Sequence, residues 1–282
     1  MITKILCLKM GDQVANKLEN LINTLNAKKF SQTFRLESIS TDSSILSLRL
    51  RSPIQLDKNL DYKVGLRYLS FYNQIVNIDN TNNIFKYSHN NGTDWTTLTI
   101  NNGSWEITEL DKEIKRMMKN RNHYDSANNS YYINIIPKPT INKIVFNITN
   151  ANYQLDRNIE NTITNYFGFN NNSLPLTNGY HIAENIMEII SVHTVDIWTN
   201  ISDGSYTLNP YGYADTSGII YDIPSMTVPI GYKVIEMPTN IDYFKLNTSV
   251  IHQIECRLLD QDGNLLNIPG ERKFISLKIE QV

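Results

Sequence analysis

Four polar side chains near the end of the sequence have the spacing of a calcium-binding loop. Asp260, Asp262 and Asn264 alternate with other residues, and Glu271 follows where an EF-hand loop places its bidentate glutamate. That loop requires glycine at its sixth position, which is Leu265 here. The flanking segments alternate like strands, so we expect a hairpin turn, with a weak Ca²⁺ site as the alternative.

The other metal-binding and nucleophilic residue types are dispersed. The five histidines form no His-x-His pair, and His193 and His252 fall on expected strands, where we interpret them as structural. Cys256 alternates with apolar residues, which predicts a buried thiol and not an activated nucleophile. The sequence contains no Gly-x-Ser-x-Gly, phosphate-loop or His-Glu-x-x-His motif. We therefore expect no enzyme, and no catalytic, cofactor or metal residues.

Positive charge gathers at the end of one expected helix. Its residues are Lys112, Lys115, Arg116, Lys119 and Arg121. They could contact phosphate, but a solvated helix face is the favoured interpretation, because the whole chain has a formal charge of −2 and a pI near 6.2. We expect no sequence-specific nucleic-acid binding.

Tyrosine is abundant, and one group of tyrosines lies in a Gly/Asn/Ser-rich stretch. The group is Tyr206, Tyr211, Tyr213 and Tyr221. Such a mixture suits a recognition surface, because tyrosine offers contact area at a low entropy cost. It suits long packed loops equally well, and both interpretations stay open.

Cysteine usage and hydropathy indicate a chain that is not secreted. The two cysteines, Cys7 and Cys256, provide no disulfide framework, which favours a reducing compartment. The apolar run from Met1 to Met10 is interrupted by Lys4 and Lys9, so we expect no signal peptide. No segment approaches the length of a membrane span.

The elements that would position these residues are mostly strands, recognised by alternating apolar and polar residues. The expected strands are 44–51, ended by Pro53, then 62–72, 84–87, 95–100, 131–136, 141–148, 189–198, 219–223, 228–237 and 243–246. Asn90-Asn91-Gly92 predicts one hairpin turn, and Pro137-Lys138-Pro139 lies at a second. Residues 250–258 and 275–279 predict a closing hairpin, in which Val250, His252 and Ile254 share the core face.

Three segments have helical periodicity or length: 11–29, 106–119 and 155–167. The second has Thr108 or Ser104 as its expected cap. Many short strands with one or two inserted helices are typical of a β-sandwich, and no linker divides the chain. We therefore expect an N-terminal helical segment over 1–35, which either packs on its own chain or acts as an arm that contacts a partner. One domain is expected over 36–282, with long loop insertions around 101–130 and 150–230.

The ending from Ile254 to Ile279 resembles the closing segment of the minor capsid (penton) proteins of Polinton/Maverick elements and adintoviruses. The strands at Leu46–Leu50 and Tyr62–Ile78, the helix at Ile107–Met118 and the segment Tyr166-Phe167-Gly168-Phe169 follow in a similar order. The resemblance implies a single jelly roll of two antiparallel sheets that forms a homopentamer at the fivefold vertices of a virion capsid. The implied partner is a double jelly-roll major capsid protein.

In such a ring we expect the large aromatic residues Trp105, Trp198, Tyr211 and Tyr213 to lie at contacts between subunits. The alternative is a carbohydrate- or receptor-binding β-sandwich that uses the 200–230 loops. A cupin-type enzyme is disfavoured by the missing His-x-His pair. A double jelly-roll major capsid subunit is disfavoured by the length of 282 residues.

Overall fold

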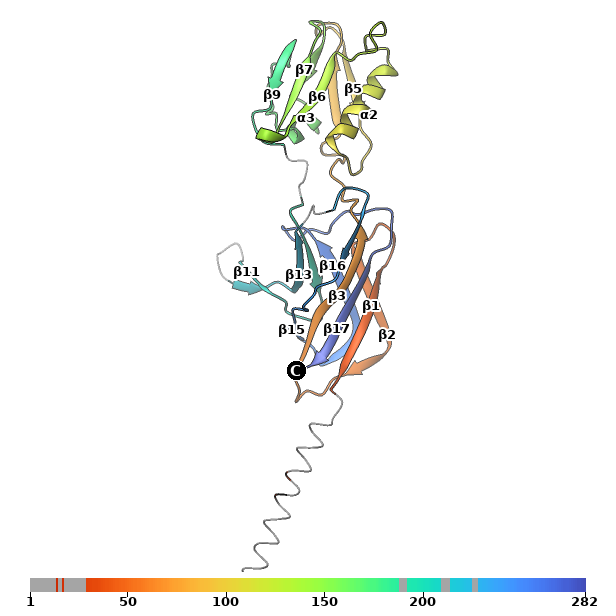
Figure 1. Ribbon diagram of the computed structural model, residues 1–282, viewed down its shortest axis with the longest axis vertical. Helices are drawn as coiled ribbons and strands as arrows, with labels where there is room; N and C mark the ends of the chain where they lie inside the picture. The colour runs from red at the N-terminus through yellow and green to blue at the C-terminus, as the bar shows by residue number, and fades with distance from the viewer. Residues whose placement is uncertain (1–13, 15–16, 18–28, 188–191, 209–213, 225–227) are drawn as a thin grey trace, which may run out of the picture.

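The protein has two separate hydrophobic cores. The computed structural model describes residues 14, 17, 29–187, 192–208, 214–224 and 228–282. One core combines residues between Phe34 and Phe71 with residues between Val192 and Ile279. The other comes from one continuous segment, Ile78 to Ala183. Figure 1 shows this second unit at one end of a sandwich of strands; we call it the inserted unit.

The sandwich has the strand order of a jelly roll. Its strands are β1 (Ser31–Ser38), β2 (Ile45–Gln55), β3 (Tyr62–Tyr72), β10 (Thr194–Thr199), β13 (Ile219–Pro224), β14 (Lys233–Glu236), β15 (Phe244–Lys245), β16 (Val250–Leu259) and β17 (Phe274–Gln281). The strands are hydrogen-bonded along one path, β13-β10-β16-β2-β1-β17-β3-β14, with β15 also on β3. This path folds into two facing sheets, β1-β17-β3-β14 and β2-β16-β10-β13, around one core. All of these pairs are antiparallel. Two such sheets are a jelly roll, so the expected fold class is confirmed.

Alternation explains why these segments form strands. In β17, Ile275, Leu277 and Ile279 are fully buried, while Lys278 and Glu280 stay on the outer face and form an ion pair. β3 spans the range that the sequence predicted, Tyr62–Tyr72. Removing such apolar side chains from water contributes roughly 1.5–3 kcal/mol each. The two sheets are joined at one side by the pairing of β1 with β2, at Glu37↔Ser47 and Ser38↔Leu46.

The predicted closing hairpin is wrong. β16 pairs with β2 and β10, whereas β17 pairs with β1 and β3 in the other sheet. The chain therefore crosses between the sheets after Leu259, and only a short return at Leu259↔Leu265 is hairpin-like. Two strands that are consecutive in sequence are not always neighbours in a sandwich, because Greek-key connections cross from sheet to sheet.

A shift of register changes the faces that were predicted for β16. The shift lies between Ile251 and Gln253, and it leaves His252 exposed while Ile251 and Ile254 are both buried. His252 therefore does not share the core face. Pro53 lies opposite this irregularity, where the ladder lacks regular pairs, so β2 continues to Gln55 instead of ending at the proline.

The inserted unit lies in the chain between β3 and β10. Its elements are β4 (Ile84–Ser88), β5 (Trp95–Thr99), α2 (Ile107–Lys119), β6 (Ile133–Lys138), a 3₁₀ turn (Pro139–Ile141), β7 (Lys143–Ile148), β8 (Gln154–Asp156), α3 (Ile163–Tyr166) and β9 (Gly179–Ile182). They form two three-stranded sheets, β5-β4-β8 and β6-β7-β9. Helix α2 buries Leu110, Ile114 and Met118 against them.

Both predicted hairpins of this unit are present. At the first turn Asn91 has φ 56° and Gly92 has φ 84°, as a two-residue turn with left-handed residues requires. The helix predicted over 155–167 is wrong, since β8 and the four-residue α3 occupy that range. The predicted cap of α2 is also wrong, because Glu106 takes that position without a side-chain hydrogen bond. Long loop insertions were expected around 101–130 and 150–230. Residues 101–130 and 150–187 instead belong to a unit that has its own core.

The N-terminal helix expected over 11–29 lies outside the described residues, apart from Val14 and Lys17, which are helical, and Lys29, which is not. A short hairpin, β11 (Tyr206–Leu208) with β12 (Ala214–Thr216), leaves the sandwich between β10 and β13. In the part of the chain that the structure describes, no helix has the length and apolar character of a membrane span.

Candidate functional site

The segment before α2 is fixed at the junction between the sandwich and the inserted unit. The Asn77 side chain accepts a hydrogen bond from the Trp105 backbone N–H and donates one to the Trp105 carbonyl, both at 2.8 Å. The Ser104 hydroxyl donates to the Ile75 carbonyl at 2.7 Å, and the Trp105 indole N–H donates to Asn101 at 3.0 Å. These bonds hold Trp105, one of the four expected contact residues, in a defined position on the surface.

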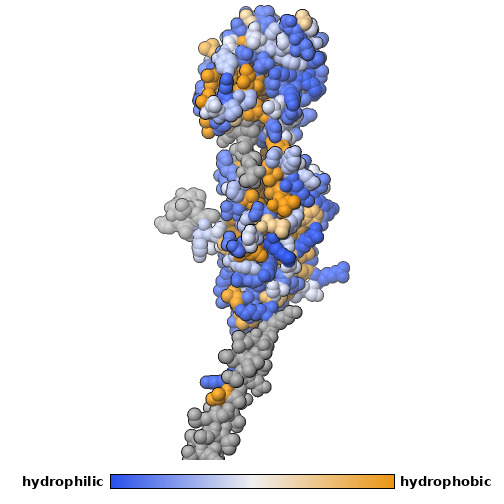
Figure 2. Space-filling model, in the orientation of Figure 1, coloured by the Kyte–Doolittle hydropathy of each residue, from blue (hydrophilic) through white to orange (hydrophobic). Residues whose placement is uncertain are grey.

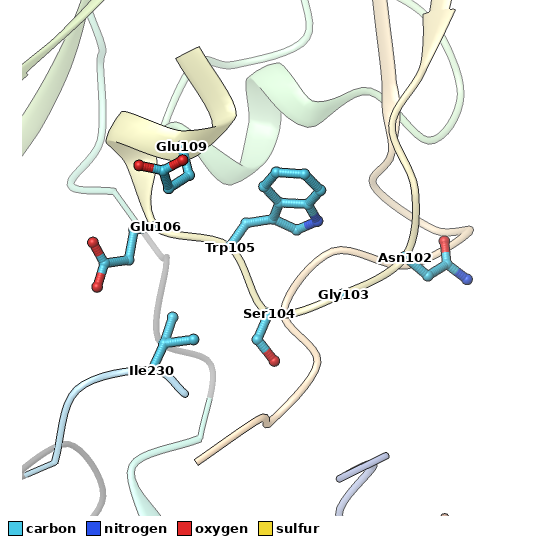
Figure 3. A pocket seen from close by; sticks show the side chains of 7 residues that line it. All are labelled: Asn102, Gly103, Ser104, Trp105, Glu106, Glu109 and Ile230. Atoms are coloured by element: carbon cyan, nitrogen blue, oxygen red, sulfur yellow. The ribbon is translucent and has the colours of Figure 1, made fainter. Parts of the chain in front are cut away.

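Trp105 lines two neighbouring hollows at this junction. The first has a volume of about 500 Å³ and is lined by Asn102, Gly103, Ser104, Trp105, Glu106, Glu109 and Ile230 (Figure 3). The second, of about 410 Å³, is more apolar and adds Ile107, Pro137, Met187, Val228 and Pro229. Ile230 reaches both from the sandwich, and Figure 2 shows hydrophobic residues on the sandwich next to the junction.

The chemistry of these hollows is that of binding. An indole face, aliphatic side chains and two carboxylates can hold an apolar or polar partner group. The Ser104 hydroxyl is engaged with a backbone carbonyl. Within the described ranges, no three His, Cys, Asp or Glu side chains converge in a way that could hold a metal ion.

Trp198 lies on the outer face of β10, far along the chain from Trp105. The Arg257 guanidinium is 4.7 Å from the centroid of the indole ring, and Arg257 also forms a 2.8 Å ion pair with Glu255. A Cβ atom added to Gly218, which has φ +71°, would lie 2.3 Å from the indole nitrogen. The indole is therefore packed between β16 and the Gly218 backbone.

The structure does not bring the four expected contact residues together. Trp105 lies at the junction and Trp198 on a sheet of the sandwich, while Tyr211 and Tyr213 lie outside the described residues. The Gly/Asn/Ser-rich stretch that contains Tyr211 and Tyr213 has two further tyrosines. Tyr206 is exposed, and the Tyr221 hydroxyl donates to Glu236 at 2.8 Å. The role of all four as subunit contacts stays a prediction.

The calcium-like loop folds as a turn. One Asp260 oxygen accepts the backbone N–H groups of Asp262 and Asn264, at 2.9 and 2.8 Å, and the other accepts the Asn264 side-chain amide at 3.1 Å. Gly263 has φ +81°. The Asp260 carboxylate thus organises the turn, as the favoured interpretation expected.

The basic end of α2 is balanced by carboxylates on the same helix. Lys112 pairs with Glu109, Lys115 with Asp111 and Arg116 with Glu113, each at 2.6 Å and three or four residues apart. Lys119 lies over the Tyr124 ring at 5.5 Å. This arrangement is that of a solvated helix face.

Two histidines that are far apart in sequence are stacked in the inserted unit. The rings of His89 and His123 are 3.8 Å apart with 22° between their planes, and His123 Nδ1 lies 2.8 Å from the Tyr87 hydroxyl. Burial lowers the pKa of His123, and the positive charge of a protonated His89 and of Arg121 lowers it further. Nothing local in the sequence indicates this pair, because His123 follows α2 and His89 follows β4.

Two buried groups of the sandwich are structural. Burial raises the pKa of the Cys256 thiol to about 12, which keeps it protonated at neutral pH. By contrast, the side chains of His193 and His252 are exposed. Lys273 is buried, donates to the carbonyls of Thr41 and Ile268, and has a pKa lowered by burial. Nothing local in the sequence marks Lys273 as buried, because it follows Glu271 and Arg272 in a polar connection.

The strand order and the junction define a single jelly-roll protein with an inserted unit and two hollows at the junction. No family model matches the chain, and no curated protein matches it. Among solved structures, the mavirus penton protein is similar, with 10% identity, a TM-score of 0.45, and coverage of 89% of this chain and 100% of that one. A chain of the Sputnik virophage is similar at 13% identity and a TM-score of 0.46, covering 89% of this chain and 98% of that one. At these TM-scores, the jelly-roll assignment rests on the strand order described above.

Proposed function

We propose that this chain is a minor capsid (penton) protein that forms homopentamers at the fivefold vertices of a virion. The observation that supports this most is the jelly-roll strand order of the sandwich, with the inserted unit confined to one end (Figure 1). The proposed neighbours are trimers of a double jelly-roll major capsid protein, as the sequence resemblance implies.

The arrangement of the sandwich and the inserted unit is compatible with contacts to neighbouring subunits in a ring. In a closed ring each subunit contacts two neighbours through two different faces of the same chain. The inserted unit continues from one end of the sandwich, so it does not cover the sides of the sandwich; among the described elements, only the β11–β12 hairpin projects from one of them (Figure 1). The buried Lys273 donates hydrogen bonds to the carbonyls of Thr41 and Ile268, which connects the segment between β16 and β17 to the segment between β1 and β2.

The test is the mass of the purified protein in solution, by native mass spectrometry and light scattering. We expect the mass of five subunits for the full chain. The same measurement without residues 1–30 assigns the arm: a pentamer that survives this deletion places the arm in contacts outside the ring. A monomer at all concentrations would contradict the proposal.

The alternative, a carbohydrate- or receptor-binding module, is favoured by one observation: the indole of Trp105 borders an open hollow beside Glu106 and Glu109. A glycan array with the full chain and with Trp105→Ala separates the two functions. A monomer that binds a glycan and loses it with Trp105→Ala would replace the capsid proposal.

A further inference from the structure

The two narrow sides of the sandwich differ in charge. At the side where β1 and β2 join the sheets, Arg35, Arg49 and Arg51 are all exposed. None of the three forms an ion pair with a carboxylate in the described parts of the chain. Arg35 lies over the Phe274 ring at 5.1 Å, and Arg49 is opposite the uncharged Gln253.

The opposite side is acidic. Asp196 on β10 and Asp222 on β13 are directly opposite each other in the antiparallel ladder, an arrangement that destabilises a sheet when both groups are charged. Burial raises the pKa of Asp196, and the charges of Asp222 and Asp260 raise it further, against a hydrogen bond from Thr194. The sequence has no lysine or arginine between Arg157 and Lys233, so β10 and β13 carry no basic residue. Lys233, the first residue of β14, lies over the Tyr72 ring at 5.8 Å.

The acidic side also carries the two free edges of the sandwich. β13 ends one sheet and β14 ends the other, and the Tyr221–Glu236 hydrogen bond joins them. Next to this edge Tyr232, Ile235 and Met237 are 55–66% exposed. An edge strand with exposed apolar side chains is a ready surface for another chain.

These observations select the partner. We propose that the acidic side of one copy, at Asp196 and Asp222, contacts the arginine side of a second copy, at Arg49 and Arg51. Two acidic sides would repel each other, and so would two arginine sides, so the contact is head-to-tail. Head-to-tail contacts form a ring when the rotation between subunits closes. This inference rests on the proposed function and deepens it by naming the surfaces of the ring.

Charge reversal tests the contact. Arg49→Glu with Arg51→Glu, and separately Asp196→Lys with Asp222→Lys, should each weaken self-association on the order of 100-fold, because each places like charges face to face. A single chain that carries all four reversals should recover the wild-type oligomer. The matched control, Lys58→Glu with Arg121→Glu, reverses two exposed charges elsewhere and should leave the mass unchanged.

A milder double substitution distinguishes a lost contact between subunits from a folding defect. Asp196→Asn with Asp222→Asn removes the repulsion within the sheet, so the subunit should melt at a higher temperature while its association weakens. A purely structural role would not move these two measurements in opposite directions. Raising the salt from about 0.1 M to about 1 M should also dissociate the wild-type oligomer.

The outcomes separate this inference from the proposed function. A wild-type chain that stays monomeric contradicts the proposed function itself. A wild-type pentamer that both reversals leave intact overturns the acid–arginine contact and leaves the pentamer standing. Dissociation by each reversal, with recovery in the fourfold variant, supports both.

Discussion

The sandwich and the inserted unit reach comparable burial by opposite routes along the chain. In the sandwich, the Phe30 backbone N–H bonds to the side chain of Gln281, 251 positions away. In the inserted unit, the Arg157–Glu184 bond spans 27 positions, and its core is continuous in sequence. Contacts between distant positions form slowly, because long loops must close first. The inserted unit is therefore the more local structure, and the two should respond separately to mutation.

The largest expected effect comes from Phe146→Ala. Phe146 is fully buried in the inserted unit and packs on Phe85, Phe167 and Phe169, with ring centroids 4.9–6.2 Å apart. The substitution should lower the free energy of unfolding of the inserted unit by about 3–5 kcal/mol. Hydrogen exchange should show lost protection across β4–β9 and normal protection in β1–β3. Equal loss in both units would show that they unfold as one.

Leu277→Ala is the matched change in the sandwich, with an expected cost of about 2–5 kcal/mol. Leu277 is fully buried on β17, which lies between β1 and β3. The sandwich should melt earlier, while the inserted unit keeps its exchange protection. A shared decrease would again contradict the comparison.

Lys273→Met should lower the free energy of unfolding of the sandwich by about 1–3 kcal/mol, because the carbonyls of Thr41 and Ile268 lose a buried hydrogen-bond donor. The effect belongs to the sandwich alone and is measured by urea unfolding. Lys58→Met, at an exposed position, is the control and should change little. A Lys273→Met chain as stable as the wild type would assign no stabilising role to this lysine.

The smallest effect is a pH dependence of the inserted unit. The pKa of His123 is lowered in the folded state, so the unfolded chain binds a proton at higher pH than the folded one. Stability is full above the unfolded value of about 6.5 and falls as the pH drops from there toward the folded pKa. Melting of the inserted unit at pH 7.5 and at pH 5 tests this, and His123→Gln should flatten the difference. An inserted unit that melts at the same temperature at both pH values would be the contrary result.

The same contrast explains what the sequence could predict. β3, α2 and the hairpin at Gly92 follow from alternation, periodicity and turn chemistry, which are local. The placement of β16 and β17 in different sheets does not, because pairing partners lie far apart in sequence. Nor can alternation alone tell that the short strands from Ile84 to Ile182 build their own core.

The candidate sites follow the same rule. The turn at Asp260 could be predicted, because the groups that donate hydrogen bonds to its carboxylate belong to the residues that follow it, Asp262 and Asn264. The stacking of His89 with His123 and the pairing of Asp196 with Asp222 depend on which strands meet, and nothing local signals them. Trp105 and Trp198 were singled out by residue type alone, which gives no position in space.

The place of β17 in its sheet has a consequence for synthesis. β17 fills the slot between β1 and β3, and its residues are translated about 200 positions after β3. At 5–20 residues per second, the ribosome leaves that slot empty for roughly 10–40 s. The inserted unit is fully translated within this interval and can fold first. A nascent chain that stops before β17 cannot complete the sheet, so premature termination would leave the sandwich unfolded.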